Sequence, residues 1–243
     1  MQLSNNKKIL YAVIILLALM SILFVIYEVD NNRHKEREDV KALYPESFTF
    51  FDLGANTELS DEMTKKLSGE LGLYAVEKMT TIDLIIRDRI FFNKNFPKLF
   101  DLNYKLNDEK GARIEHNITN LVFRYPQKEN TPFDNVKLVF SNYTKKPLLF
   151  SVTARKKEAD MADTLKGKYG EPVLINWDDG KSVSLLWEKN RDCLVFSKIS
   201  ERGGFKYSIM IYFVNNLENM LKIEQNEVIK REEERTKAGK TAF

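Results

Sequence analysis

The longest apolar stretch of the chain lies near its N-terminus, where residues 9–27 read ILYAVIILLALMSILFVIY and follow Lys7 and Lys8. As an α-helix this run reaches about 28 Å, close to the thickness of a bilayer's hydrocarbon core. The bulky residues at its end, Phe24 to Glu28, do not resemble a signal-peptide cleavage site. We therefore expect a retained, single-pass transmembrane anchor, a signal anchor, at residues 9–27.

The charges around this run predict its orientation. Lys7 and Lys8 lie almost against the apolar residues, whereas the nearest base on the other side is Arg33. The positive-inside rule then makes residues 1–8 a short cytoplasmic tail and places the rest of the chain outside the cytoplasm. Residues 28–43 are nearly all polar and mixed in sign, which predicts a solvated stalk.

Two later segments carry apolar residues at every fourth position and end at a glycine, as short amphipathic helices do. The stripe of the first is Leu59, Met63, Leu67 and Leu71, after which comes Gly72; that of the second is Met161, Leu165 and Tyr169, followed by Gly170. Ser60 is suited to cap the first helix. Superimposing Met63 on Met161 also aligns Leu67 with Leu165, and Gly69 and Gly72 with Gly167 and Gly170. Two accounts remain open: a duplicated unit, or the stop signal common to short helices.

Alternation of apolar and polar residues predicts strands in the C-terminal half. A hairpin is expected from Val136 to Ala154, and a meander from residues 173 to 213 with turns at Asp179-Gly180, residues 189–192 and Gly203-Gly204. A highly charged helix is expected from residues 216 to 238.

The N-terminal half is a weaker copy of this pattern. Its candidate strands are Phe48 to Leu53, residues 82–86 and residues 99–106, and a second small sheet follows from them. A long strand around His116 changes phase, which predicts a bulge near Thr119. The predicted fold class is therefore α+β: an N-terminal transmembrane helix, then antiparallel sheets each covered by a short amphipathic helix, then a charged C-terminal helix. We expect a first α+β unit at 44–130, a second at 131–215 and a charged helix or tail at 216–243.

Composition narrows the function only a little. The chain of 243 residues is 43% hydrophobic and has a formal net charge of +3, with 38 basic and 35 acidic side chains, so nothing resembles a nucleic-acid-binding surface. The single Cys193 cannot form an internal disulfide, which fits a reducing compartment or a bacterial envelope protein.

Few residues are candidates for chemistry. His116 is a candidate general base, although a histidine satisfied by one hydrogen bond in a core is the commoner case. Trp177 and Trp187 are candidates for an apolar binding surface, although tryptophans at alternating positions more often fill a core. Cys193 and His116 are too few for zinc, so no metal and no cofactor are expected.

These observations favour a protein of the inner (plasma) membrane whose periplasmic or extracytoplasmic domain acts as a binding or envelope-assembly component. Its expected partners are the bilayer and another envelope protein, and an enzymatic role is the less favoured reading. Two alternatives remain open. One is a membrane-anchored enzyme that uses His116 with an acidic partner, and the other is a cytosol-facing regulatory domain. The ligand, the process and the oligomeric state do not follow from the sequence.

Overall fold

The computed structural model describes residues 46–107, 112–125, 132–154 and 161–241, with the side chains of residues 239–241 excepted. Residues Tyr44 to Phe243 form one compact unit. The expected tail, anchor and stalk (residues 1–43) and the expected boundary at residues 130 and 131 lie outside the described residues. None of the described helices is long and apolar enough to cross a bilayer.

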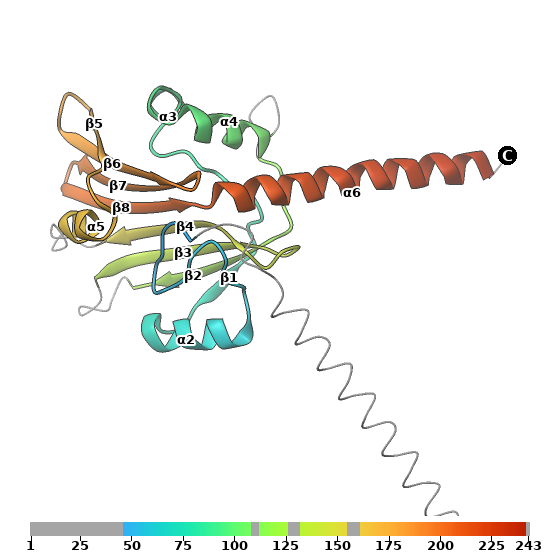
Figure 1. Ribbon diagram of the computed structural model, residues 1–243, viewed down its shortest axis with the longest axis horizontal. Coiled ribbons are helices and arrows are strands. Elements are labelled where there is room, and N and C mark those ends of the chain that lie inside the picture. The colour runs from blue at the N-terminus through green and yellow to red at the C-terminus, as the bar shows by residue number, and fades with distance from the viewer. Residues whose placement is uncertain (1–45, 108–111, 126–131, 155–160, 242–243) are drawn as a thin grey trace, which may run out of the picture. The chain divides into compact units, whose positions relative to one another are not determined.

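The described strands form one eight-stranded antiparallel sheet with the order β1-β2-β3-β4-β8-β7-β6-β5 (Figure 1). They are β1 (Ala75–Glu77), β2 (Ile118–Arg124), β3 (Phe133–Ser141), β4 (Pro147–Ala154), β5 (Val173–Trp177), β6 (Ser182–Lys189), β7 (Asp192–Glu201) and β8 (Gly204–Tyr212). The α+β class is confirmed, but the prediction of two sheets is wrong. β4 pairs with β8 from Leu149↔Tyr212 to Ala154↔Tyr207. This pairing joins the strands β1 to β4 to the strands β5 to β8, so neither β4 nor β8 is an exposed edge strand.

Helices cover both faces of the sheet. α2 (Asp61–Leu71) and α5 (Met161–Tyr169) pack on one face, over a cluster that includes Phe123, Phe150 and Trp187. α3 (Arg89–Asn95), α4 (Pro97–Lys105) and α6 (Val214–Thr241) contribute to a second cluster with Val139, Val195 and Tyr212. Because neighbouring strand residues point to opposite faces, the two clusters are the two sides of the sheet.

Both predicted amphipathic helices are confirmed. The Ser60 hydroxyl accepts a hydrogen bond from the Met63 N–H at 3.1 Å and caps α2, and Gly72 and Gly170 end their helices with φ of 83° and 84°. In each half a helix leads into an outer strand, β1 or β5, and the half ends at a central strand, β4 or β8. This order is what a duplication would produce, and the duplication remains a hypothesis.

The weaker N-terminal pattern was partly misread. Residues 99–106 form most of α4 and its cap instead of a strand, because Pro97 fits the first helical turn and Leu99, Leu102 and Leu106 lie on one buried side. Residues 82–86 are outside any strand, although Ile82, Leu84 and Ile86 are buried.

The bulge expected near Thr119 is also absent from the described pairing of β2 with β3, which runs without a break from Ile118↔Ser141 to Arg124↔Asn135. The phase of the pattern changes because the strand only begins at Ile118. Residues 114–117, with His116, precede it and are tied to residues 80 and 81 by a Glu115–Thr81 bridge and the His116 N–H···O=C Thr80 bond.

The charged terminal helix is confirmed and is longer than expected. Leu217, Met220 and Leu221 are buried in the second cluster, whereas every residue from Val228 to Ala238 is exposed. In Figure 1 the helix leaves the sheet and continues away from the other described elements. We call residues 228–241 the projecting part of α6.

Candidate functional site

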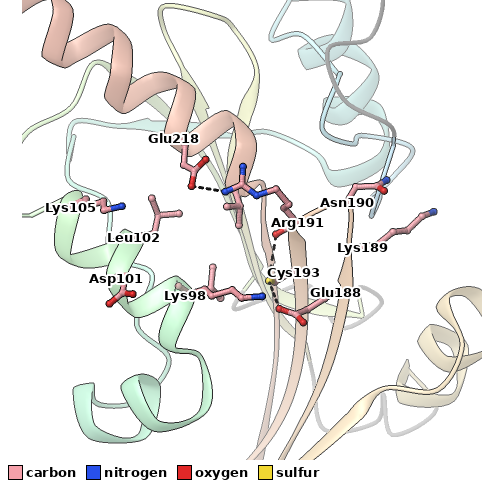
Figure 2. A pocket seen from close by; sticks show the side chains of 12 residues that line it. Lys98, Asp101, Leu102, Lys105, Glu188, Lys189, Asn190, Arg191, Cys193 and Glu218 are labelled. Atoms are coloured by element: carbon pink, nitrogen blue, oxygen red, sulfur yellow. Dashed lines mark hydrogen bonds and ion pairs between the residues drawn. The ribbon is translucent and has the colours of Figure 1, made fainter.

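A hollow of about 530 Å³ lies between α4, the turn joining β6 to β7, and the first turns of α6. We call it the α4–α6 pocket (Figure 2). Leu99, Leu102 and Val214 give it apolar walls, and charged side chains from all three elements surround these walls. The sheet holds one side of the pocket and the second apolar cluster fixes α4 and α6, so the opening is part of the packed fold.

The turn that carries the pocket's arginine has a restricted backbone. Lys189 pairs with Asp192, so Asn190 and Arg191 form a two-residue hairpin loop with φ of 54° and 74°. Both values belong to a type I′ turn, which favours Asn and Gly and is unfavourable for Arg. The Arg191 guanidinium donates to Asn215 Oδ1 at 3.0 Å and to Glu218 Oε1 at 2.8 Å. These bonds join the turn to the start of α6.

Asp192 also stabilises the contact between the β6–β7 turn and the start of α6. Its carboxylate accepts hydrogen bonds from the Val214 N–H at 2.9 Å and from the Ser47 hydroxyl, and so it caps the N-terminus of α6. Burial raises the pKa of Asp192 to about 6, although these hydrogen bonds oppose the shift. Asp192 is therefore a structural carboxylate, already engaged on both oxygens.

The remaining charges of the pocket are mixed in sign. Lys98, Lys105 and Lys189 form no ion pair with a described carboxylate, and Asp101 and Glu188 form none with a described base. Figure 2 shows Lys98 reaching from α4 toward Glu188 and Cys193. The pocket can therefore receive both anionic and cationic groups.

Cys193 lies at the bottom of this pocket but is poorly suited to nucleophilic chemistry. Its side chain is buried, and burial, followed by the neighbouring Glu188 charge, raises the pKa of the thiol to about 12. At neutral pH the thiol is protonated, whereas the reactive form of cysteine is the thiolate.

The structure places His116 in a buried position at the end of α4, and it does supply an acidic partner. Nδ1 lies 2.8 Å from Glu224 Oε2 of α6, and Nε2 donates to the Leu106 carbonyl at 2.9 Å. Burial lowers the pKa of His116, but the two hydrogen bonds and the charge of Glu224 together outweigh it, and the pKa lies above its ordinary 6.5. Both ring nitrogens face acceptors, so neither offers a lone pair to a substrate in this arrangement.

The two tryptophans are buried on opposite faces of the sheet. Trp187 packs in the first cluster and its indole N–H donates to the Gly170 carbonyl at 2.7 Å. Trp177 contacts Phe91 of α3, lies under the Arg87 guanidinium at 4.5 Å and donates to the Ser184 hydroxyl. The structure does not bring Trp177 and Trp187 together into one surface.

Sequence reasoning did not find Arg191 or Glu224. The turn at residues 189–192 was predicted, but only the folded chain places its arginine against α6. Glu224 lies in a run of mixed charges, 108 positions after His116, and no local spacing connects the two. Within the described ranges no group of three or more His, Cys, Asp or Glu side chains is arranged to hold a metal ion.

No protein-family model, no curated protein and no solved structure matches this chain.

Proposed function

We propose that this chain is a single-pass, membrane-anchored extracytoplasmic protein that acts as a binding or envelope-assembly component, with the projecting part of α6 as its docking element. Residues 9–27 would hold it in the inner membrane. The observation that carries the proposal is the helix itself, which stays helical from Val228 onward although each residue to Ala238 is exposed.

A helix of this kind gains little from its own domain. Most helical stability in proteins comes from packing of an apolar face, and a short isolated helix is marginal in water. The Glu227–Arg231 pair at 3.1 Å stabilises the segment by a few tenths of a kcal/mol, as exposed pairs of this spacing do. A partner that lies along the exposed length would add the missing contacts, and Val228 and Ile229 are two exposed apolar side chains at the start of it.

The order of charges favours a different protein over a second copy of this chain. Basic Lys230 and Arg231 precede acidic residues 232–234, and Arg235, Lys237 and Lys240 follow them. This basic-acidic-basic order reads nearly the same in both directions. In-register pairing with a second copy, parallel or antiparallel, therefore places like charges together, which is destabilising. We expect another envelope protein that presents an acidic-basic-acidic surface.

The test is crosslinking in native membranes, followed by affinity purification and mass spectrometry of the full chain and two variants. One variant ends after Asn226. The other keeps the net charge but inverts the charge order through Lys230→Glu, Arg231→Glu, Glu232→Lys and Glu233→Lys. A matched control exchanges exposed charges on α2 through Glu62→Lys, Lys65→Glu, Lys66→Glu and Glu70→Lys.

The full chain and the α2 control are expected to capture the same partner, and both α6 variants to lose most of it. Equal capture by the chain ending at Asn226 would overturn α6 as the docking element. Capture of a second copy alone would reject the different partner, and no captured protein in any sample would reject the assembly role.

The two alternative functions, an enzyme and a cytosol-facing regulatory domain, are tested separately. The enzyme alternative is supported by the 2.8 Å contact of His116 with Glu224, and it requires Leu106 or Glu224 to move away so that a ring nitrogen becomes free. Loss of an activity in folded His116→Ala protein would support it. The cytosol-facing alternative predicts that protease added outside intact cells leaves the C-terminus uncut.

A further inference from the structure

The hydrogen bonds of His116 require a proton on each nitrogen of its ring. A carbonyl oxygen only accepts hydrogen bonds, so His116 Nε2 must carry a proton to bond Leu106. The Glu224 carboxylate accepts a second bond, from the Asn117 N–H at 3.2 Å, and this leaves its other oxygen to accept from Nδ1. Both ring nitrogens then donate, which only the imidazolium form of histidine can do.

The His116–Glu224 contact lies where the buried part of α6 gives way to its exposed part. Glu224 follows Leu221, the last buried residue among the described side chains of the helix, and precedes the exposed residues from Val228 to Ala238. One turn further, Glu227 accepts a hydrogen bond from the Tyr143 hydroxyl at 3.0 Å. These two carboxylates therefore bind the body of the domain at the root of the projecting part.

We propose that His116 and Glu224 form a proton-dependent clamp that holds the root of the projecting part of α6 against the domain. With the proton present, one cation joins three segments: the C-terminal end of α4, the residues before β2, and α6 at Glu224. When the proton leaves, one ring nitrogen presents a lone pair to an acceptor, either the Glu224 carboxylate or the Leu106 carbonyl. That repulsion loosens the root while Leu217, Met220 and Leu221 keep the first turns of α6 in place.

The titratable groups near His116 come from three segments: α6, the turn between β3 and β4, and the residues before β2. From α6, Glu224 and Glu227 face this region, and Glu227 is shared with Arg231. From the turn between β3 and β4, Tyr143 is neutral, because burial and its bond to Glu227 raise the pKa of its hydroxyl. The C-terminal cap of α4 contributes the Leu106 carbonyl to the ring, and Glu115 is the adjacent acid in the chain.

The sign of the pH dependence follows from the raised pKa of His116. A group whose pKa is higher in the folded state binds its proton more tightly there, so its stabilisation is complete below the unfolded value of 6.5. The clamp is therefore closed at acidic pH and opens as the pH rises through the folded pKa. This inference concerns the chain itself and does not rest on the proposed partner.

The first measurement is NMR of the His116 ring nitrogens in the full chain in lipid nanodiscs, with His116→Gln used to assign the signals. At pH 6 we expect both nitrogens to be protonated, with a titration midpoint above 6.5. Glu224→Gln removes the charge without changing the shape, and it should lower the midpoint by about one pH unit. Glu218→Gln is the matched control on the same helix, because Glu218 pairs with Arg191 and not with His116, and it should leave the midpoint unchanged.

The second measurement is the distance between spin labels at Lys94→Cys and Lys230→Cys, both exposed positions, in the same nanodiscs. The distance distribution should be narrow at pH 6 and broad above the midpoint, and in Glu224→Gln it should broaden at lower pH. A single protonated ring nitrogen at pH 6 would overturn the clamp's charge state. A distribution that stays the same through the titration would overturn its mechanical role, whether or not α6 captures a partner.

Discussion

The helix–sheet half that begins with α2 and the half that begins with α5 share their local pattern but differ in how deeply the helix is buried. Both helices have apolar residues at every fourth position and a glycine with φ near 84° or 83° after the last turn. Met63, Leu67 and Leu71 of α2 are buried, whereas no residue of α5 is buried and Met161, Leu165 and Tyr169 only pack against the cluster.

The comparison shows that the orientation of an amphipathic helix and the depth of its burial are separate properties. The stripe determines which side of the helix faces the sheet, because residues four apart lie above one another. How much the contact stabilises depends on the area removed from water, and the rest of the fold sets that area. The two halves therefore look equivalent in sequence but should respond unequally to mutation.

The largest difference is expected at the central leucine of each stripe. Leu67 is 2% exposed, so Leu67→Ala should leave a cavity and lower the free energy of unfolding by about 2–5 kcal/mol. Leu165→Ala should cost less than half as much, because its side chain already contacts solvent. Urea unfolding followed by tryptophan fluorescence measures both, and equal losses would contradict the difference between the halves.

The glycines offer a test in which the halves should agree. Gly170→Ala forces a Cβ into a left-handed backbone and should destabilise by about 1–2 kcal/mol, although no atom lies within 4 Å of the new group. Gly167→Ala, one turn earlier in the helix, also enters open space and should stabilise by about 0.5–1 kcal/mol. Thermal unfolding of Gly72→Ala and Gly69→Ala should show the same opposite signs; if it does not, the two helix ends are not equivalent.

The smallest loss of stability is expected at the start of α2. Ser60→Ala removes the acceptor for the Met63 N–H and should lower stability by about 1 kcal/mol. Ser60→Asp, which keeps an acceptor oxygen, serves as its control and should unfold close to the unaltered chain. A loss with Ser60→Asp as large as with Ser60→Ala would show that the hydroxyl acts in some other way than as a cap.

Much of the fold could be predicted, and the failures have specific causes. The strands from Phe133 to Tyr212 followed from alternation and from the turns between them, although β4 and β7 are largely buried on both faces. Residues 99–106 were misread because a short apolar run fits both a strand and a helix, and Pro97 at the helix start was the signal that could have decided it. Two sheets were expected because the sequence contains no mark of the pairing between β4 and β8.

The site was less predictable than the fold. His116 was identified, but its partner Glu224 and the carbonyl of Leu106 come from elements that only folding brings together. The α4–α6 pocket likewise combines α4, a hairpin turn and the first turns of α6. Such sites depend on contacts between distant segments, and local periodicity carries no information about those contacts.

The sequence by itself determined many of the elements: where α2 and α5 stop, which strands of the C-terminal half alternate, and that α6 is charged along most of its length. These features depend on interactions between residues close in sequence, such as the conformation of the glycine after a helix and the alignment of apolar residues four positions apart on one side of it. The tertiary structure alone decided that the halves share one sheet, that α2 is buried more deeply than α5, and that His116 meets Glu224. Those outcomes depend on contacts between distant segments, where many arrangements satisfy the same local pattern and packing selects one of them.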